Sequence, residues 1–200
     1  NPKPLLLMHG WPGSVLEFLH IIEKLAHPEK YGGKIDDAFD VIVPSLPGFG
    51  FSGKPLRPIG PRKIAKILNH LMTTNLGYEN YIAQGGDWGA TICNWIGHDY
   101  PKNCKAIHIN CLTMRLADGP QTEDETCWQT KFDKDQIMQD GYRTQQATKP
   151  QTLSYGMMDS PVGIAAWIIE KMYFWSDLKN KNIESIYSKD TLLANIMVYI

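Results

Sequence analysis

In the first half of the chain, short apolar runs typical of strands alternate with segments in which apolar residues have helical spacing. Short apolar runs of strand length occur at Leu5–Met8, Phe39–Val43, Tyr81–Ala83 and Ala106–Ile109. Between these runs, apolar residues recur every three or four positions, as on one face of a helix, in residues 14–26, 61–76 and 89–100. Strands that alternate with helices predict an α/β fold with a mostly parallel sheet and helices on both faces.

Local signals place the ends of several of these elements. Ser14 precedes the first helical pattern and Glu17 follows three residues later, which predicts a capping box at the start of a helix. Residues 44–61 are rich in Pro, Gly and Ser and predict a long loop. Gly77 is the predicted end of the next helix, because glycine readily adopts the left-handed conformation that closes helices.

The second half of the chain has a different pattern. Residues 113–200 contain no clear strand, and helical patterns occupy residues 123–140, 161–176 and 188–200. Ser160 and Pro161 have the types expected at the N-cap and first position of a helix, and Ser188 has the type expected at another N-cap. We therefore expect a core of the sheet in residues 1–112 and an inserted, incomplete helical cap in residues 113–200. The chain starts in a strand pattern and stops in a helical one, so we expect it to be truncated at both ends.

Composition excludes several classes of function. The hydrophobic fraction is 43%, the formal net charge is -1, and no basic stripe suggests nucleic acid as a partner. No apolar run approaches the roughly 20 residues that a membrane-spanning helix needs. The four cysteines lack the spacing of a zinc site, so we expect free thiols and no metal.

The strongest chemical signal is the sequence Gly85-Gly86-Asp87-Trp88-Gly89, which follows a predicted strand and precedes a predicted helix. This is the arrangement of the nucleophile elbow, G-x-Ser-x-G, with aspartate in place of serine. The turn is tight, so small residues are needed two positions before and after the nucleophile. The sequence therefore predicts Asp87 as a nucleophile, with capping of the following helix as the alternative role.

A second motif, His9 to Gly13, follows the first strand. The loop at this place in an α/β-hydrolase supplies one backbone N–H of the oxyanion hole, which points to the amide of Trp11. The amide of Trp88, directly after the nucleophile, is the other expected donor. We interpret the His9 side chain as a hydrogen-bonded structural group rather than the catalytic base.

A carboxylate nucleophile favours particular substrates. It is ionised at neutral pH and displaces a leaving group at saturated carbon to form an ester, which water then hydrolyses. Epoxides and alkyl halides both fit. Opening an epoxide releases an alkoxide and needs an acid, which a tyrosine can supply. The predicted cap contains five tyrosines, each of which could equally pack an amphipathic helix: Tyr142, Tyr155, Tyr173, Tyr187 and Tyr199.

Five longer segments carry a resemblance to a known family: HGWPGS at 9–14, VPSLPGFGFSGKP at 43–55, QGGDWG at 84–89, GYRTQQATKPQTL at 141–153 and DSPVG at 159–163. Together they resemble the microsomal-type epoxide hydrolases and their bacterial relatives. The resemblance covers nearly the whole chain. HGxPG alone occurs in many α/β-hydrolases, so the specificity comes from the loop, elbow and cap segments in combination.

The resemblance implies an α/β-hydrolase fold with an inserted cap, and Asp87 as the nucleophile. It implies that Tyr142 is the proton donor, as one of two cap tyrosines that polarise the epoxide oxygen. The expected partner is a small-molecule epoxide that is converted to a vicinal diol, without a cofactor, and a homodimer stays open. The second tyrosine, the acid and the histidine of the family's triad are expected beyond Ile200.

The histidines agree with that expectation. The chain order in this fold is nucleophile, acid, histidine, and His98 and His108 are the histidines that follow Asp87. The first lies in the helix behind the elbow and the second in a strand, so neither is expected to complete the triad. Membrane-bound members of the family carry an anchor in an N-terminal segment. We expect a cytoplasmic location and leave such an anchor open.

Two alternatives accompany this prediction. A haloalkane dehalogenase shares the fold and the Asp-Trp elbow, but the GYRTQQ segment favours an epoxide hydrolase. A catalytically inactive binding protein on a hydrolase scaffold is the other alternative. The sequence does not identify the substrate.

Overall fold

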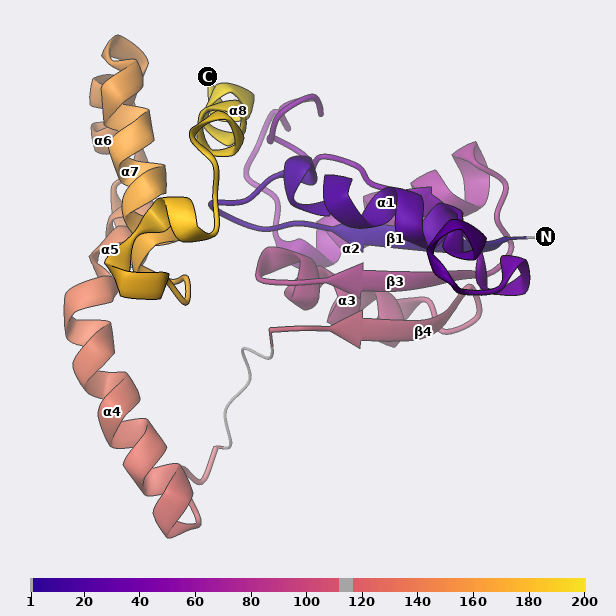
Figure 1. The fold of residues 1–200 in the computed structure, drawn as a ribbon, viewed down its shortest axis with the longest axis horizontal. Helices are drawn as coiled ribbons and strands as arrows, with labels where there is room; N and C mark the ends of the chain where they lie inside the picture. The colour runs from indigo at the N-terminus through magenta and orange to yellow at the C-terminus, as the bar shows by residue number, and fades with distance from the viewer. Residues whose placement is uncertain (1, 112–116) are drawn as a thin grey trace. The chain divides into compact units, whose positions relative to one another are not determined.

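A parallel sheet organises the first half of the molecule (Figure 1). The computed structural model describes residues 2–111 and 117–200. Within them, the strands lie in the order β2-β1-β3-β4 and are β1 (Lys3–Met8), β2 (Phe39–Ile42), β3 (Tyr81–Gly85) and β4 (Cys104–Ile109). All three neighbouring pairs are parallel, with Leu5 opposite Ile82 and Ile82 opposite Ala106. The predicted α/β class and parallel sheet are confirmed.

The two faces of the sheet are covered by different helices. Leu5 and Leu7 of β1 point to the face where Phe18 and α1 (Leu19–Ala26) pack. Leu6 and Met8 point to the opposite face, which α2 (Pro61–His70) and α3 (Trp88–Asp99) cover. The period of two along β1 therefore divides its side chains between two cores, as the apolar run of a strand buried on both sides requires.

The predicted capping box at Ser14 is wrong. Residues Val15–Phe18 form a short 3-10 turn, η1, and the α-helix begins only at Leu19. Ser14 Oγ accepts a hydrogen bond from the N–H of Leu16 at 3.3 Å, rather than from that of Glu17. The carboxylate of Glu17 instead faces the loop after β1, where a Cβ on Gly13 would lie 2.8 Å from Glu17 Oε1.

The end of the second helix agrees with its predicted signal. A π-helical turn, η4 (Leu71–Asn75), continues α2, and Gly77 follows with a φ of 75°. Four further short turns complete the assignment: η2 (Pro28–Tyr31), η3 (Ile35–Asp37), η5 (Lys179–Lys181) and η6 (Ile183–Ser185).

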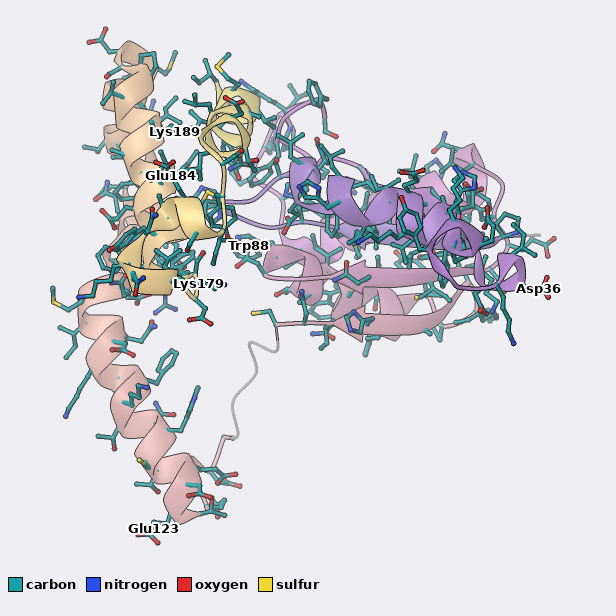
Figure 2. All side chains as sticks on the ribbon, viewed as in Figure 1. Asp36, Trp88, Glu123, Lys179, Glu184 and Lys189 are labelled. Atoms are coloured by element: carbon teal, nitrogen blue, oxygen red, sulfur yellow. The ribbon has the colours of Figure 1, made fainter. Side chains whose placement is uncertain are left out.

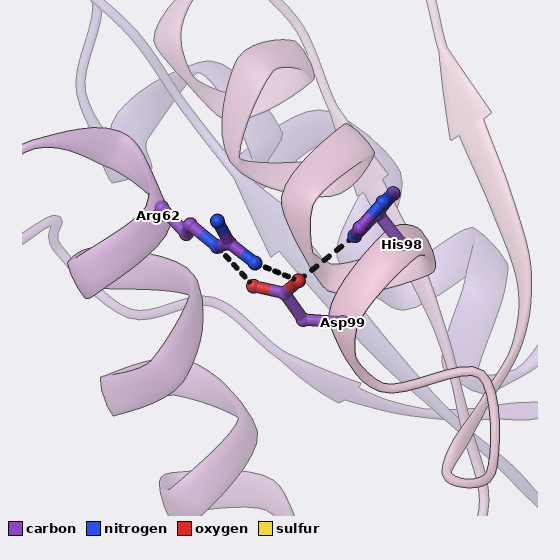
Figure 3. Close-up of polar contacts among 3 residues, drawn as sticks. All are labelled: Arg62, His98 and Asp99. Carbon is purple, nitrogen blue, oxygen red and sulfur yellow. Dashed lines mark hydrogen bonds and ion pairs between the residues drawn. The ribbon is translucent and has the colours of Figure 1, made fainter.

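Three polar side chains join α2 to the far end of α3 (Figure 3). The Nε and Nη2 atoms of Arg62 each donate to an oxygen of Asp99 at 2.7 Å. The ring nitrogen Nδ1 of His98 lies 2.8 Å from the same carboxylate. Hydrogen bonds lower the pKa of Asp99 to about 2. The bond from Arg62 has the larger effect and the bond from His98 the smaller. The guanidinium also covers the ring of Trp95 at 4.5 Å, so α2 is fastened to the helix that starts at the elbow.

The second half of the described chain is helical, as predicted. Its helices are α4 (Glu123–Gln139), α5 (Gly141–Thr148), α6 (Pro150–Asp159), α7 (Pro161–Phe174) and α8 (Lys189–Tyr199). Ser160 Oγ accepts from the N–H of Gly163, and Ser188 Oγ accepts from that of Thr191, so both predicted N-caps are confirmed. The helices α5 and α6 were not predicted.

The chain divides into two compact units. One comprises residues 1–113 together with Asp177–Tyr199, and the other comprises residues 114–176 together with Ile200. We call them the sheet unit and the cap unit. The predicted boundary between residues 112 and 113 lies outside the described residues. The predicted cap extended to residue 200, whereas residues 177–199 group with the sheet.

Residues 2–111 and 117–200 lack a membrane-spanning helix and a metal-binding cluster. No helix there is both long enough and apolar enough to cross a membrane. In the same ranges, no three acidic, histidine or cysteine side chains gather in a way that could hold a metal ion.

Candidate functional site

Asp87 occupies a strained turn between β3 and α3. Its φ of 50° and ψ of -122° lie in a region that residues with a side chain rarely adopt. Such strain persists only where the surrounding structure holds it in place, and it concentrates at functional sites. The side chain is exposed at the carboxyl end of the sheet, and so is Trp88, which opens α3 and is labelled in Figure 2.

The glycines on either side of Asp87 are required by close backbone approach. A Cβ atom on Gly85 would lie 2.2 Å from the carbonyl carbon of Gly89, and one on Gly89 would lie 2.2 Å from the carbonyl oxygen of Met8. A Cβ on Gly86 would lie 2.5 Å from Asn110 Oδ1. The turn thus packs α3 directly against the ends of β1 and β3. This is the physical demand for small residues that the sequence analysis inferred.

The carboxylate of Asp87 faces the loop after β1. The N–H of Trp11 donates to Asp87 Oδ1 at 2.8 Å, and the side chain makes no capping hydrogen bond to α3. The alternative role of a helix cap is therefore wrong. Trp88 is the first residue of α3, where N–H groups have no partner within the helix. Two predicted donors, the amides of Trp11 and Trp88, thus belong to the segments that meet at Asp87.

His9 is a buried structural residue, as predicted. Its Nε2 accepts a hydrogen bond from the N–H of Leu46 at 3.0 Å, so the proton of the neutral ring lies on Nδ1, which is 3.1 Å from the carbonyl oxygen of Gly10. Burial lowers its pKa, which keeps the ring uncharged. His9 therefore joins the loop after β1 to the long loop at residues 44–61.

Glu17 is a second carboxyl group near Asp87, and the sequence analysis did not place it there. A Cβ on Gly13 would lie 2.8 Å from Glu17 Oε1, so the carboxyl lies against the loop after β1. Glu17 is an exposed residue, yet partial burial of its carboxyl raises its pKa to about 7. A backbone hydrogen bond from Gly10 opposes this rise, and the negative charge of Asp87 adds to it. Glu17 lies eight residues after His9, in the short turn η1 that follows the His9–Gly13 loop. This spacing could have predicted that its carboxyl lies near the loop.

Helix α8 also binds the loop after β1, through two side-chain hydrogen bonds. Asn195 Nδ2 donates to the carbonyl oxygen of Pro12 at 2.8 Å, and the hydroxyl of Tyr199 donates to that of Gly13 at 2.5 Å. Burial raises the pKa of Tyr199, and the neighbouring carboxyls of Glu17 and Asp87 raise it further. Tyr199, one of the five candidate acids, thus belongs to the sheet unit and uses its proton to hold the loop.

An apolar cavity of about 230 Å³ opens beside the elbow, within the sheet unit. Its walls come from the long loop, from α2 and from the start of α3: Leu46, Pro47, Phe49, Pro55, Ile59, Pro61, Ile64, Trp88 and Ile92. Because Trp88 follows the predicted nucleophile directly, the cavity can take an apolar group attached to a reacting carbon.

Tyr142 lies at the start of α5 in the cap unit, where it is half-buried. Its ring meets that of Trp175 edge to face, with centroids 5.0 Å apart. The ammonium of Lys171 lies 5.3 Å from the centroid of the Tyr142 ring. By contrast, Tyr155 is 67% exposed, and its hydroxyl accepts a hydrogen bond from Gln151 Nε2.

The histidines after Asp87 lie where the sequence analysis expected them. His98 is in the last turn of α3, about 15 Å along the helix axis from its start, and it contacts Asp99. His108 lies within β4. Both thus lie in regular elements rather than in the turn that carries Asp87.

Comparison with protein families gives one match that spans most of the chain. The family model described as alpha/beta hydrolase fold matches residues 3–193.

Individual relatives are similar along the whole chain. A protein of Stigmatella aurantiaca, provisionally named an epoxide hydrolase, is 44% identical over 100% of this chain and 46% of its own length. Epoxide hydrolase 1 of Oryctolagus cuniculus is 36% identical over 100% of this chain and 49% of its own. The crystal structure of juvenile hormone epoxide hydrolase from Bombyx mori superposes with a TM-score of 0.80 and 35% identity, covering 100% of this chain and 47% of that one. The chain thus spans about half the length of these relatives, and the resemblance read from its motifs is confirmed.

Proposed function

Because the chain belongs to the alpha/beta hydrolase fold family and resembles epoxide hydrolases along its whole length, we propose that the protein adds water to epoxides through an ester on Asp87. The product is a vicinal diol. The observation that carries the proposal is the placement of Asp87, an aspartate in a strained turn with the N–H of Trp11 aimed at its carboxylate.

In the first step, one carboxylate oxygen of Asp87 attacks a carbon of the epoxide. A bond forms between them, the ring C–O bond breaks, and its electron pair remains on the epoxide oxygen. The carboxylate is exposed on the face of the turn, so a substrate can reach it. The apolar cavity beside Trp88 supports a substrate with an apolar substituent on the reacting side.

The epoxide oxygen needs a proton as negative charge grows on it. We assign Tyr142 as the donor, because an unperturbed tyrosine, with a pKa of about 10, is protonated at neutral pH. A donor whose hydrogen bond strengthens in the transition state raises the rate of the step. The support is the place of Tyr142 in the GYRTQQ segment, and its ring is held by Trp175 and Lys171.

In the second step, water attacks the carbonyl carbon of the ester, and negative charge develops on the carbonyl oxygen. The N–H of Trp11, which meets Asp87 Oδ1 at 2.8 Å, supports a role for this amide in stabilising that oxygen. The amide of Trp88 and the positive end of α3 support it from the other side. The step also needs a base that activates water. His9, His98 and His108 are placed elsewhere, as described above.

The two alternatives differ from this proposal in what they would release. A dehalogenase would liberate halide from a haloalkane, and a binding protein would release neither diol nor halide. The relatives found by sequence and by structure carry the name epoxide hydrolase, which favours the first proposal. A cytoplasmic location and a homodimer stay predictions.

The proposal is tested by replacing the nucleophile in the full-length protein. We expect Asp87→Ala to lower diol formation from styrene oxide by roughly 10⁴-fold or more, because the covalent route is lost. Asp36→Ala removes an exposed carboxylate in η3 and is the matched control, with activity unchanged. Activity of the Asp87 variant within tenfold of wild type would contradict the proposal, and halide release from 1-bromobutane without diol formation would favour the dehalogenase.

Isotope labelling tests the ester directly. In a single turnover in water enriched in heavy oxygen, the oxygen added to the diol should come from Asp87 and be unlabelled. The label should appear in the peptide that contains Asp87. A labelled diol after the first turnover would indicate direct attack by water.

A further inference from the structure

The cap unit contains a buried cation. Among its described residues, 117–176, only Ile168 and Lys171 are buried, and Lys171 is 3% exposed. Lysine is rarely buried unless its charge is paired, because removing an ammonium from water is costly. One of the two buried residues in this part of the cap unit is thus a charged lysine. The groups that contact its ammonium suggest its role.

The partners of the Lys171 ammonium include the ring of the proposed acid. The Nζ atom lies 2.5 Å from Oε1 of Glu170, whose side chain is half exposed, and 3.5 Å from the carbonyl oxygen of Gln139. It also lies 5.3 Å from the centroid of the Tyr142 ring and 5.9 Å from that of Trp175. Both distances are within the range of a cation–π contact.

The cluster draws on three helices of one unit. Gln139 ends α4, Tyr142 lies in the first turn of α5, and Lys171 lies in α7, which ends before Trp175. The aromatic rings of Tyr142 and Trp175 are inclined by 66° to each other and both contact the ammonium. Two charged neighbours of Tyr142 in the sequence, Asp140 and Arg143, are paired with each other at 2.7 Å. Lys171 contacts the face of the Tyr142 ring itself.

We propose that Lys171 is a positioning residue for Tyr142, which fixes the ring and stabilises the negative charge that the ring acquires during alkylation. The inference rests on the proposed function. When the ring C–O bond of the epoxide breaks, the hydroxyl proton of Tyr142 passes to the epoxide oxygen, and a phenolate remains until water returns a proton.

The charge of a phenolate is shared between its oxygen and its ring. A cation at the ring is attracted more strongly to the phenolate than to the neutral phenol, and burial weakens the screening by water. The contact is thus stronger after proton transfer than before it, which is the condition for accelerating the step. The same charge has no corresponding role when water hydrolyses the ester.

The test measures the two steps separately in the full-length protein. Lys171→Met retains the length of the apolar stem and removes the charge, and we expect alkylation of Asp87 to slow about tenfold. Lys171→Arg retains a cation and should keep the alkylation rate within a few-fold of wild type. Lys131→Met removes an exposed charge from α4 of the same unit and should have no effect.

A merely structural role is distinguished by a double-mutant cycle. If Lys171 acts through Tyr142, then Lys171→Met should have little further effect on alkylation in a protein that already carries Tyr142→Phe. Hydrolysis of the preformed ester should be unchanged. An equal effect in both backgrounds, equal slowing of both steps, or no effect of Tyr142→Phe on alkylation overturns the inference.

A second variant keeps the inference testable if Lys171→Met does not fold. Glu170→Gln removes the neighbouring negative charge and leaves the buried lysine in place, so alkylation should be as fast as in wild type or faster. Slower alkylation in this variant overturns the inference. These outcomes are separate from failure of the proposed function, which would appear as diol formation by Asp87→Ala.

Discussion

The two proposed reacting groups are held in place by different means. Asp87 in the sheet unit is fixed by backbone, with Gly85 and Gly89 so close to neighbouring backbone atoms that a side chain would not fit without a shift of the chain. Tyr142 in the cap unit is fixed by side chains, with Trp175 and Lys171 against its ring. A nucleophile that must meet a carbon atom along one direction is held rigidly, whereas a proton donor is held by contacts that tolerate small adjustments.

The largest expected effect tests the backbone side of this contrast. In Gly89→Ala, the new Cβ would lie 2.2 Å from the carbonyl oxygen of Met8. Helix α3 and strand β1 must therefore move apart. We expect a loss of about 3 kcal/mol in the free energy of unfolding, measured by urea denaturation. Diol formation by the folded fraction should fall about 10²-fold, since a shift of about 1 Å at a reacting group costs that much.

The cap unit offers the matched control. Gly156 lies within α6 and has no atom within 4 Å of an added Cβ. Gly156→Ala should therefore stabilise the protein by up to about 1 kcal/mol, because alanine favours the helix. If both variants had the same stability, the glycines of the elbow would not be held by close packing.

A smaller effect on alkylation is expected at Tyr142, the group that is held by side chains. Tyr142→Phe retains the ring and its contacts with Trp175 and Lys171, and removes only the hydroxyl. We expect alkylation of Asp87 to slow about 10²-fold while the thermal midpoint barely changes. Tyr155→Phe, at an exposed position, should leave alkylation unchanged. An unchanged rate in the Tyr142 variant would remove this residue from the mechanism.

The smallest effect concerns Glu17, the second carboxyl beside the elbow. Its pKa is raised to about 7, so its contribution to stability is fully present below about pH 4.5, the ordinary value, and is lost as the pH rises through 7. Glu17→Gln stays uncharged throughout. Between pH 5 and pH 8, wild type should therefore lose stability relative to this variant, as measured by thermal midpoints.

Glu79→Gln, at an exposed position before β3, is the control and should follow the pH dependence of wild type. Parallel stability curves for wild type and Glu17→Gln would show that Glu17 titrates as an ordinary surface carboxyl.

The sequence could predict the elements whose cause is local. The period of two along β1, the small residues around Asp87 and the Ser160-Pro161 start of α7 each act within a few residues, and the structure has them as expected. Helices α5 and α6 were missed because their sequences are mostly polar and Pro150 separates them, so no apolar stripe marks them.

Long-range contacts were out of reach of the sequence. The predicted capping box at Ser14 is absent because Ser14 Oγ binds the N–H of Leu16 and the carboxyl of Glu17 lies against the preceding loop at Gly13. Asn195 and Tyr199 contact a loop more than 180 residues earlier in the chain, and helical periodicity cannot reveal such partners. The cluster around Lys171 is of the same kind, since it joins residues from three helices.

Residues 177–199 belong to the sheet unit, so the chain on both sides of the cap unit is attached to the sheet unit. This attachment affects the proposed acid, Tyr142. Asn195 and Tyr199 fasten α8 to the loop after β1, so the segment that carries Tyr142 is tethered at both ends rather than at one. A tethered group acts at an effective concentration, on the order of millimolar for a short flexible link, without any affinity of its own for the site. A single proteolytic cut within the cap would leave the donor on one tether and lower this concentration, although every residue of the site remained intact.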